Sequence, residues 1–333
     1  MPLVDQPLNP ELLQQLTQAR ALKKWPLGKL ISLFENRNPD AAQQRHDIAR
    51  HIQNHPQEFP RNARIVGFTG TPGAGKSSLI AELCRKLLVL DDSIAIAVLA
   101  VDPSSQISGG SILGDRTRMH YGKKEDRLFF RSQASNLELG GVSEATFQAT
   151  RLMRHLFDLI LVETVGIGQN EIDIQHLTDH TFLVMQPLAG DQIQFMKSGI
   201  MEIPDSFVVN KCDEEKLARS SYHMLRSSLR QARILDLTTK DDYPNASREQ
   251  IFLTSALKGL GLDLLARAIL QIPNRRPVQE IETFYLKKSI MRRYGEFGLS
   301  VLDQDMDLLQ RERTFEGKET AALDRIRRHI SWP

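Results

Sequence analysis

Residues 70–77 read Gly-Thr-Pro-Gly-Ala-Gly-Lys-Ser and have the types and spacing that phosphate binding requires. Glycines let backbone N–H groups turn inward around an anion, and a following helix N-terminus adds partial positive charge. Lys76 can reach the β- and γ-phosphates of a nucleotide, and the Ser77 hydroxyl can ligate Mg²⁺. The competing interpretation is a chance glycine turn between a strand and a helix. The predicted phosphate-binding residues are Gly70, Thr71, Pro72, Gly73, Ala74, Gly75, Lys76, Ser77 and Ser78.

A second motif, Asn210-Lys211-Cys212-Asp213, follows a predicted strand and precedes a predicted helix. The carboxylate of Asp213 can accept hydrogen bonds from guanine N1–H and its 2-amino group. Adenine lacks both donors, so a buried carboxylate would remain unpaired against it. We expect Asn210 to tie loops together and Lys211 to lie across the base. A polar turn at a strand end is the alternative, because the four-residue pattern is short.

A third segment, residues 254–259, ends the last predicted strand with Thr-Ser-Ala-Leu-Lys-Gly. The backbone N–H of Ala256 is placed to donate to guanine O6. Ser255, Ala256 and Leu257 are therefore predicted to complete the base-binding site. The match is informative only beside the other two motifs.

Three acids lie where a divalent cation would be needed. Asp102 ends the second predicted strand, and Asp115 lies in the long polar segment that follows it. Glu163 ends the fourth strand, in Glu-Thr-Val-Gly. Carboxylates at strand ends beside a phosphate loop are suited to Mg²⁺, directly or through water. We predict Ser77, Asp102, Asp115 and Glu163 as metal ligands, although Asp102 could be a turn residue before proline and Asp115 a solvated acid.

Two further residues suit a site that hydrolyses the γ-phosphate. The N–H of Gly166 can meet that phosphate, and Gln169 can orient the attacking water. The predicted catalytic residues are Lys76, Asp115, Glu163 and Gln169. Arg116 and Arg118 lie in a loop from which they could stabilise charge.

These motifs must be positioned by alternating strands and helices. The predicted strands are residues 63–69, 93–101, 127–131, 158–163, 181–185, 206–210 and 250–254. Helical patterns separate most of them, which predicts an α/β fold with a mostly parallel sheet flanked by helices, the P-loop NTPase class. Ligands of such sheets bind beyond the carboxyl ends of the strands, where the motifs fall.

The chain divides into three predicted regions. Residues 1–60 are helical and form an N-terminal extension; residues 61–275 form the nucleotide-binding domain; residues 276–333 form a charged C-terminal helical region. The amphipathic stripes of the last region show burial but not the partner. They allow either a tail folded onto its own domain or an arm that packs on another subunit.

Composition narrows the class of protein. The 333 residues carry 43 basic and 41 acidic side chains, a net charge of +2, which gives no support for nucleic-acid binding. Two cysteines, Cys84 and Cys212, do not make a disulfide framework. No apolar run reaches the roughly 18 residues of a membrane span. We expect a cytoplasmic protein with no membrane association.

The motifs together resemble the MeaB/ArgK family of GTPases over about residues 63–270. The resemblance is carried by Val101–Ser105, Ser108–Arg116, Glu163–Gln169 and Ala189–Asp191, and by Gly199–Ile203 leading into Asn210–Asp213. The Ser108–Arg116 run is specific to the family, whereas the phosphate loop is not. The chain departs from the pattern at residues 133–138, at Leu188, where glycine is expected, and beyond residue 280.

The resemblance implies a homodimeric, Mg²⁺-dependent GTPase that binds GTP and GDP and serves an adenosylcobalamin-dependent acyl-CoA mutase, chiefly methylmalonyl-CoA mutase. GTP hydrolysis in such proteins gates cofactor loading and protects or reactivates the mutase. The resemblance also implies that the C-terminal arm makes the dimer and that Asp102, Asp115 and Glu163 surround Mg²⁺. Lys197 would lie on a loop that responds to the partner.

Two other functions use the same phosphate loop. A metallochaperone GTPase would need a Cys/His cluster, and the sequence offers only the i, i+4 pair His176 and His180. A small-molecule kinase would need an acceptor site, and the guanine-type motif at residues 210–213 argues against it.

Overall fold

The structure is a computed structural model that describes residues 7–102, 125–134, 142–164, 172–187, 204–231, 251–304 and 312–330. Contacts within the chain define two compact units. The sheet unit comprises residues 63–143 and 157–275, and the helical unit comprises residues 1–62, 144–156 and 276–333. The helical unit is therefore built from three separate stretches of sequence.

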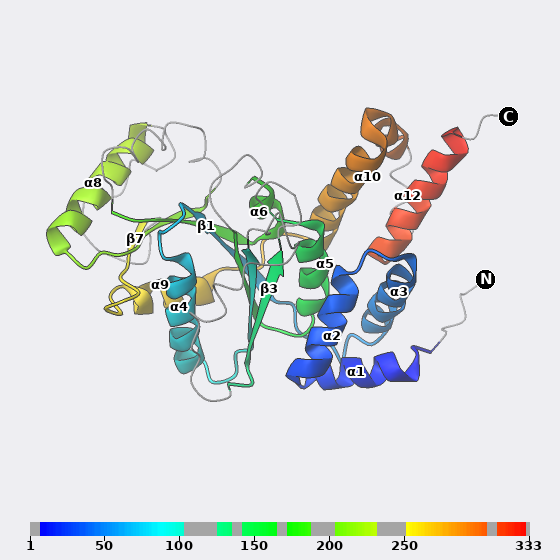
Figure 1. Cartoon of the computed structure of the whole chain (residues 1–333), viewed down its shortest axis with the longest axis horizontal. Helices are drawn as coiled ribbons and strands as arrows, with labels where there is room; N and C mark the ends of the chain where they lie inside the picture. Colours follow the sequence, from blue (N-terminus) through cyan, green and yellow to red (C-terminus); the bar gives the residue numbers. More distant parts are fainter. Residues whose placement is uncertain are drawn as a thin grey trace. The chain divides into compact units, whose positions relative to one another are not determined.

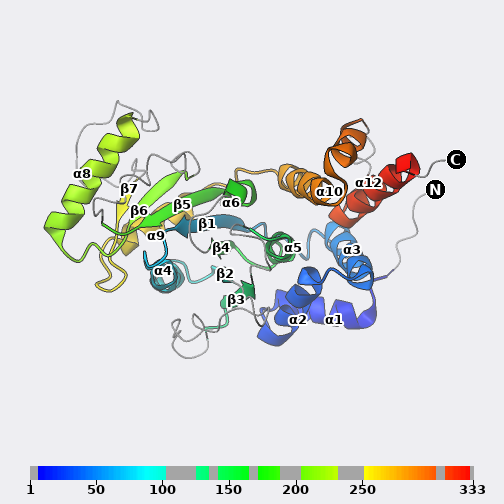
Figure 2. The same cartoon turned by 45° about the horizontal axis from the view of Figure 1, so that its top comes forward.

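Seven strands form one sheet in the order β3-β2-β4-β1-β5-β6-β7, and every pairing is parallel. Several of these strands are seen side by side in Figure 2. Their bounds are β1 Arg64–Gly70, β2 Ile96–Asp102, β3 Leu128–Ala134, β4 Leu159–Glu163, β5 His180–Met185, β6 Ser206–Val209 and β7 Ile251–Leu253. The predicted parallel α/β fold is confirmed, with strand ends shifted by up to three residues.

Helices cover both faces of the sheet (Figure 1). They are α4 Lys76–Leu90, α6 Ile172–Leu177, α8 Glu215–Gln231 and α9 Leu262–Gln271. Alternate strand residues point to opposite faces, so Phe68 and Phe182 pack with α4 and α9, whereas Leu183 and Phe207 pack with α8. Buried apolar residues on both faces explain why these strands read as nearly continuous hydrophobic runs.

Three aspartates close the amino-terminal edge of this sheet. Each immediately precedes a strand and accepts a hydrogen bond from a backbone N–H of the neighbouring strand or the residue before it. Asp158 accepts from Ala95 at 2.7 Å, Asp179 from Ile65 at 2.8 Å and Asp205 from Thr181 at 2.8 Å. Asp179 also accepts from the N–H of Arg275 at 3.0 Å. Carboxylates thus satisfy backbone amides at the amino-terminal ends of β2, β1 and β5.

The helical unit consists of α1 Pro10–Arg20, α2 Lys24–Glu35, α3 Pro39–Asn54, α5 Glu144–Met153, α10 Val278–Asp303 and α12 Phe315–Ile330. The sequence predicted the terminal helices, and it placed α5 among the alternating elements. In the structure α5 packs in the helical unit, where Phe147 stacks on Tyr285 with ring centroids 4.1 Å apart. No helix in the described ranges is long and apolar enough to cross a membrane.

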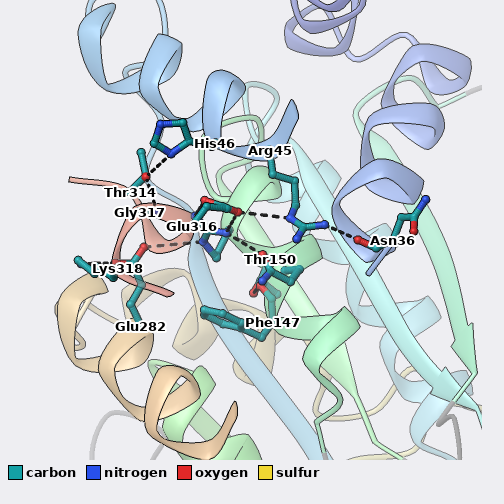
Figure 3. A network of polar contacts seen from close by, with 12 residues as sticks. Asn36, Arg45, His46, Phe147, Thr150, Glu282, Thr314, Glu316, Gly317 and Lys318 are labelled. Atoms are coloured by element: carbon teal, nitrogen blue, oxygen red, sulfur yellow. Dashed lines mark hydrogen bonds and ion pairs between the residues drawn. The ribbon is translucent and has the colours of Figure 1, made fainter. Parts of the chain in front are cut away.

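A buried ion network joins four helices of this unit (Figure 3). Glu316 of α12 accepts from Arg151 Nη1 and Nη2 at 2.6 and 2.9 Å and from Arg45 Nε at 3.3 Å. Glu282 of α10 lies 3.7 Å from Arg151 Nε and accepts from Lys318 at 2.6 Å. Burial would lower the pKa of Arg151, but Glu316 and Glu282 raise it. The network therefore holds α3, α5, α10 and α12 together through paired opposite charges.

Candidate nucleotide-binding site

The phosphate loop joins the end of β1 to the start of α4, as predicted. Gly70 has φ +142°, and a Cβ placed there would lie 1.9 Å from the carbonyl oxygen of Val184. Gly75, the residue that caps α4, has φ +82°, and a Cβ would lie 2.8 Å from Asn210 Nδ2. Only glycine fits at these two positions, because both the backbone angle and the space exclude a side chain. No side chain caps the first amides of α4, which suits an anion at that helix end.

Lys76 lies over the loop that precedes it. Its Nζ donates to the carbonyl of Gly70 at 2.8 Å and to that of Thr71 at 3.3 Å, and the residue is only 8% exposed. A lysine held in this position is within the loop whose amides would surround a phosphate. The structure therefore places the predicted cation at the predicted anion site.

Ser77 and Glu163 meet at the carboxyl edge of the sheet. The Ser77 hydroxyl donates to Glu163 Oε1 at 2.7 Å, and Glu163 is buried. Strand β2 pairs with β4 so that Ala100 lies opposite Glu163. Asp102, the last residue of β2, thus reaches the same edge, although its side chain is not among the described atoms. Hydroxyl and carboxylate oxygens are the ligands that Mg²⁺ prefers, so the residues present fit that ion.

Asn210 connects the phosphate loop to the segment after β7. Its Nδ2 donates to the carbonyls of Ala74 and Gly75 at 2.9 and 3.4 Å. Its Oδ1 accepts from Thr254 Oγ1 and from the Ala256 N–H, both at 3.2 Å. Asn210 is 1% exposed, so all of these bonds are shielded from water. The expected role of Asn210 in joining loops agrees with this geometry.

The remaining base-binding candidates surround Asn210. Lys211 has φ +63°, which is unusual for a residue with a side chain, and its Cε lies 3.7 Å from the position of a Cβ on Gly75. The lysine stem therefore runs alongside the phosphate loop. Asp213, whose burial the argument for guanine selection assumed, is exposed in the structure, and its Oδ1 accepts from the Ser255 hydroxyl at 2.5 Å. This bond leaves further carboxylate lone pairs for a ligand.

Two features of this region differ from the sequence analysis or were missed by it. The Ala256 N–H, which we assigned to guanine O6, donates instead to Asn210 in the structure. Lys258 was not selected, yet its Nζ donates to the Asp213 carbonyl at 2.8 Å and its N–H to Ser255 Oγ at 3.0 Å. Leu257 is 89% exposed beside these residues. Only the tertiary fold reveals the role of Lys258, because lysine after a strand has no distinctive local signal.

Cys212 lies within the motif but faces the interior. Its thiol donates to the Val209 carbonyl at 3.1 Å, and its N–H donates to the Thr254 carbonyl at 2.9 Å. Burial raises the pKa of the thiol to about 11. A thiol this weakly acidic packs as a small apolar group.

Several predicted site residues lie outside the described residues. Asp115, Gly166, Gln169 and Lys197 belong to this group, as do Arg116 and Arg118. His176 and His180, the pair that a metallochaperone would need, are described. His180 Nε2 lies 3.0 Å from the Ser206 hydroxyl, and across the described ranges no group of three or more His, Cys, Asp or Glu side chains could hold a metal ion.

The chain was compared with known proteins. Residues 27–280 match the family model described as methylmalonyl-CoA mutase-associated GTPase MeaB. A probable GTPase of Mycobacterium tuberculosis is 33% identical over 315 residues, covering 93% of this chain and 83% of that protein. The GTPase ArgK of Escherichia coli is 31% identical over 263 residues, covering 78% of this chain and 75% of that protein.

Other relatives match a smaller part of the chain. A putative GTPase of Pyrococcus horikoshii is 41% identical over 211 residues, covering 63% of this chain and 62% of its own length. The alignment to a Pyrococcus abyssi counterpart spans 59% of that protein. The crystal structure of a LAO/AO transport system kinase has a TM-score of 0.59 at 21% identity, covers 98% of this chain and 99% of its own, and supports the fold alone.

The family match spans more than half of the chain, and it includes every motif from the phosphate loop to the segment after β7. The chain therefore belongs to the MeaB family of methylmalonyl-CoA mutase-associated GTPases.

Proposed function

We propose that the protein is a Mg²⁺-dependent GTPase that acts as a chaperone for an adenosylcobalamin-dependent acyl-CoA mutase. The observation that carries the nucleotide part is Asn210, which holds the phosphate loop and the segment after β7 in one buried hydrogen-bonded unit. This joins a phosphate-binding element to the exposed carboxylate of Asp213, as a guanine nucleotide requires. Family membership supports the same reaction.

The site residues supply charge and position for attack of water on the γ-phosphate. Lys76 is close enough to the loop to exchange its contact with the Gly70 carbonyl for one with phosphate oxygens. Ser77, Glu163 and Asp102 would hold Mg²⁺, which neutralises phosphate charge when bound. Asp115, Gly166 and Gln169 remain proposed as a metal ligand, a phosphate contact and a water-orienting group.

Calorimetry with GDP, GTP and ATP in the presence of Mg²⁺ tests the base preference. We expect tight binding of both guanine nucleotides, and we expect Asp213→Ala to weaken it by at least tenfold, because the base loses a charged hydrogen bond. Glu214→Ala, which removes the adjacent acid, is the matched control and should bind like wild type. Equal affinity for ATP and GTP would overturn the guanine assignment.

The mutase part of the proposal is supported by the family and by a relative. The methylmalonic aciduria type A homolog of Caenorhabditis elegans, a mitochondrial protein by name, is 35% identical over 201 residues, covering 58% of this chain and 50% of that protein. We propose that GTP hydrolysis gates cofactor loading and that the mutase accelerates it. Mixing the protein with methylmalonyl-CoA mutase should raise GTP turnover, and unchanged turnover with no co-purification would exclude this partner.

We further propose that the protein is a homodimer whose C-terminal helices form the arm. Helix α10 exposes Met291 and Phe297 at 45% and 48%, an apolar surface that a second subunit could cover. Light scattering should give twice the chain mass for wild type and the single mass for Met291→Glu with Phe297→Glu. A monomeric wild-type protein would contradict the proposal that the C-terminal helices form a dimer.

A further inference from the structure

Two buried threonine hydroxyls beside the phosphate site have no hydrogen-bond partner among the residues that the structure describes. Thr69 and Thr164 are 2% and 0% exposed, and the Oγ1 of each is unpaired within the part of the chain that the structure describes. Thr69 directly precedes Gly70, the first residue of the phosphate loop. Thr164 directly follows Glu163 at the end of β4.

The two threonines lie on neighbouring strands. Phe68 of β1 is opposite Glu163 of β4, and the Thr164 N–H donates to the Phe68 carbonyl at 3.0 Å. Strand alternation places Thr69 on the face away from Phe68. Gly67 shares that face, and a Cβ there would lie 2.7 Å from Ile174 of α6. The hydroxyls thus belong to the α6 face, at the phosphate end of the sheet.

Burial under α6 does not by itself prevent a threonine from finding a partner. Thr178 and Thr181 are equally buried, and Thr181 lies opposite Gly67 on this face. Their hydroxyls are 2.8 Å apart, and Thr178 also donates to the Ile174 carbonyl at 2.9 Å. An unpaired buried hydroxyl lowers stability, and folded proteins keep few of them. The unpaired hydroxyls here flank the nucleotide site, which points to a functional reason.

Each of these two threonines is adjacent in sequence to a residue that accepts a hydrogen bond from Lys76 or Ser77. The Gly70 carbonyl, after Thr69, accepts from Lys76. Glu163, before Thr164, accepts from Ser77. Both contacts must be exchanged if Lys76 is to reach a phosphate and Ser77 a metal ion. The strand ends that carry Gly70 and Glu163 would then need other hydrogen bonds to stay in place.

We propose that Thr69 and Thr164 are positioning residues for GTP hydrolysis, whose hydroxyls gain their hydrogen-bond partners when the nucleotide is bound. They act through Gly70 and Glu163 rather than on the substrate. This inference rests on the proposed GTPase function. It implies that the two hydroxyls lower the stability of the nucleotide-free protein and improve the geometry of the reacting complex.

Valine variants separate this role from ordinary packing. Thr164→Val and Thr69→Val remove the unpaired hydroxyl at constant shape, so each should raise the Tm of the nucleotide-free protein by about 2–4 °C. Each should also lower kcat by about tenfold or more, with KM and the Kd for GDP within twofold of wild type. Thr181→Val, the matched control, breaks a paired hydroxyl and should lower Tm while leaving kcat unchanged.

Thr164→Ser tests the hydroxyl itself. Because serine keeps the hydroxyl and loses only a methyl group, it should restore kcat to within about threefold of wild type. A wild-type kcat in both valine variants would overturn the inference. So would a serine variant that is as slow as the valine variant. Weakened GDP binding that accounts for the slower turnover would also overturn it. If wild type itself hydrolyses no GTP, the proposed function fails and the inference with it.

Discussion

Replacement of Glu316 in the buried ion network should destabilise the helical unit strongly. Glu316 accepts three hydrogen bonds from two guanidinium groups, and the side chains of Glu316, Arg45 and Arg151 are 5%, 6% and 10% exposed. Removing one partner of such a group leaves the opposite charges buried and uncompensated, which costs about 3–5 kcal/mol. Glu316→Gln should therefore lower the free energy of unfolding by that amount, a large fraction of the roughly 5–15 kcal/mol typical of a domain.

The double variant distinguishes a coupled network from independent contacts. Arg151→Met alone should also cost several kcal/mol, because Glu316 loses its bidentate partner. The combined Arg151→Met and Glu316→Gln variant removes one charge of each sign and should cost at least about 2 kcal/mol less than the sum. Arg327→Ala is the surface control: Arg327 and Asp324 are 68% and 53% exposed, and the change should be within about 0.5 kcal/mol.

Urea unfolding provides the assay. Of the two tryptophans in the sequence, Trp25 lies in α2 of the helical unit, so its fluorescence reports on that unit, and circular dichroism reports on the whole chain. A loss below 1 kcal/mol for Glu316→Gln, or additive single variants, would refute the reasoning about uncompensated burial.

The pH dependence has a definite sign. Burial would raise the pKa of Glu316, but Arg151 and Arg45 outweigh it and hold the pKa below the ordinary glutamate value. As pH falls, the unfolded state protonates first, so the stabilising contribution is complete above the unfolded pKa and is lost below it. The difference between wild type and Glu316→Gln should therefore shrink below about pH 4.5.

Three further predictions concern the sheet unit. Gly70→Ala should abolish nucleotide binding in calorimetry, because its Cβ would meet the Val184 carbonyl. Gly73→Ala has open space around it and should cost only about 1 kcal/mol of backbone strain. Equal effects of the two substitutions on nucleotide binding would contradict the packing argument. Asp179→Ala should lower the free energy of unfolding by about 2–3 kcal/mol, and Asp205→Ala should lower it by less. The reason is that Asp179 is buried and accepts two backbone hydrogen bonds, whereas Asp205 is exposed. A lower denaturant midpoint for Asp205→Ala than for Asp179→Ala would contradict this prediction. Cys212 should resist alkylation at pH 8, where a pKa of about 11 leaves roughly one thiolate in a thousand, and rapid labelling of the folded protein would disprove its burial.

The positions of the described motifs at strand ends were predictable because each motif carries its own local geometry. The phosphate loop needs glycines with φ values that other residues avoid, and the strand before it and the helix after it have opposite periodicities. Asn210 and Asp213 were likewise placed correctly after a strand, because the apolar run that ends at Val209 is a clear strand pattern. The parallel pairing of all seven strands then follows from their alternation with helices.

What could not be predicted depends on contacts between distant residues. The pattern of α5 shows an amphipathic helix, but it does not say that Phe147 meets Tyr285 or that Arg151 meets Glu316, 165 residues later in the chain. The Ala256 amide was assigned to guanine because nothing local indicates that Asn210 accepts from it. Likewise, the sequence shows Thr69 and Thr164 only as ordinary strand residues, and the structure is needed to show that both are buried and that neither hydroxyl has a partner in the described ranges.

The division of the helical unit into three stretches of sequence limits which deletions the protein can tolerate and how the unit could be transferred to another protein. Deleting residues 276–333 would uncover Arg151 and the face of Phe147 that stacks on Tyr285, leaving a cation and an aromatic ring exposed on α5. A gene fusion could not transplant the unit by joining it to either end of another GTPase, since the recipient would also need the α5 sequence between β3 and β4. Both ends of the chain and this internal helix must therefore change together, and natural variants of Arg151 should be accompanied by changes at Glu316 or Glu282.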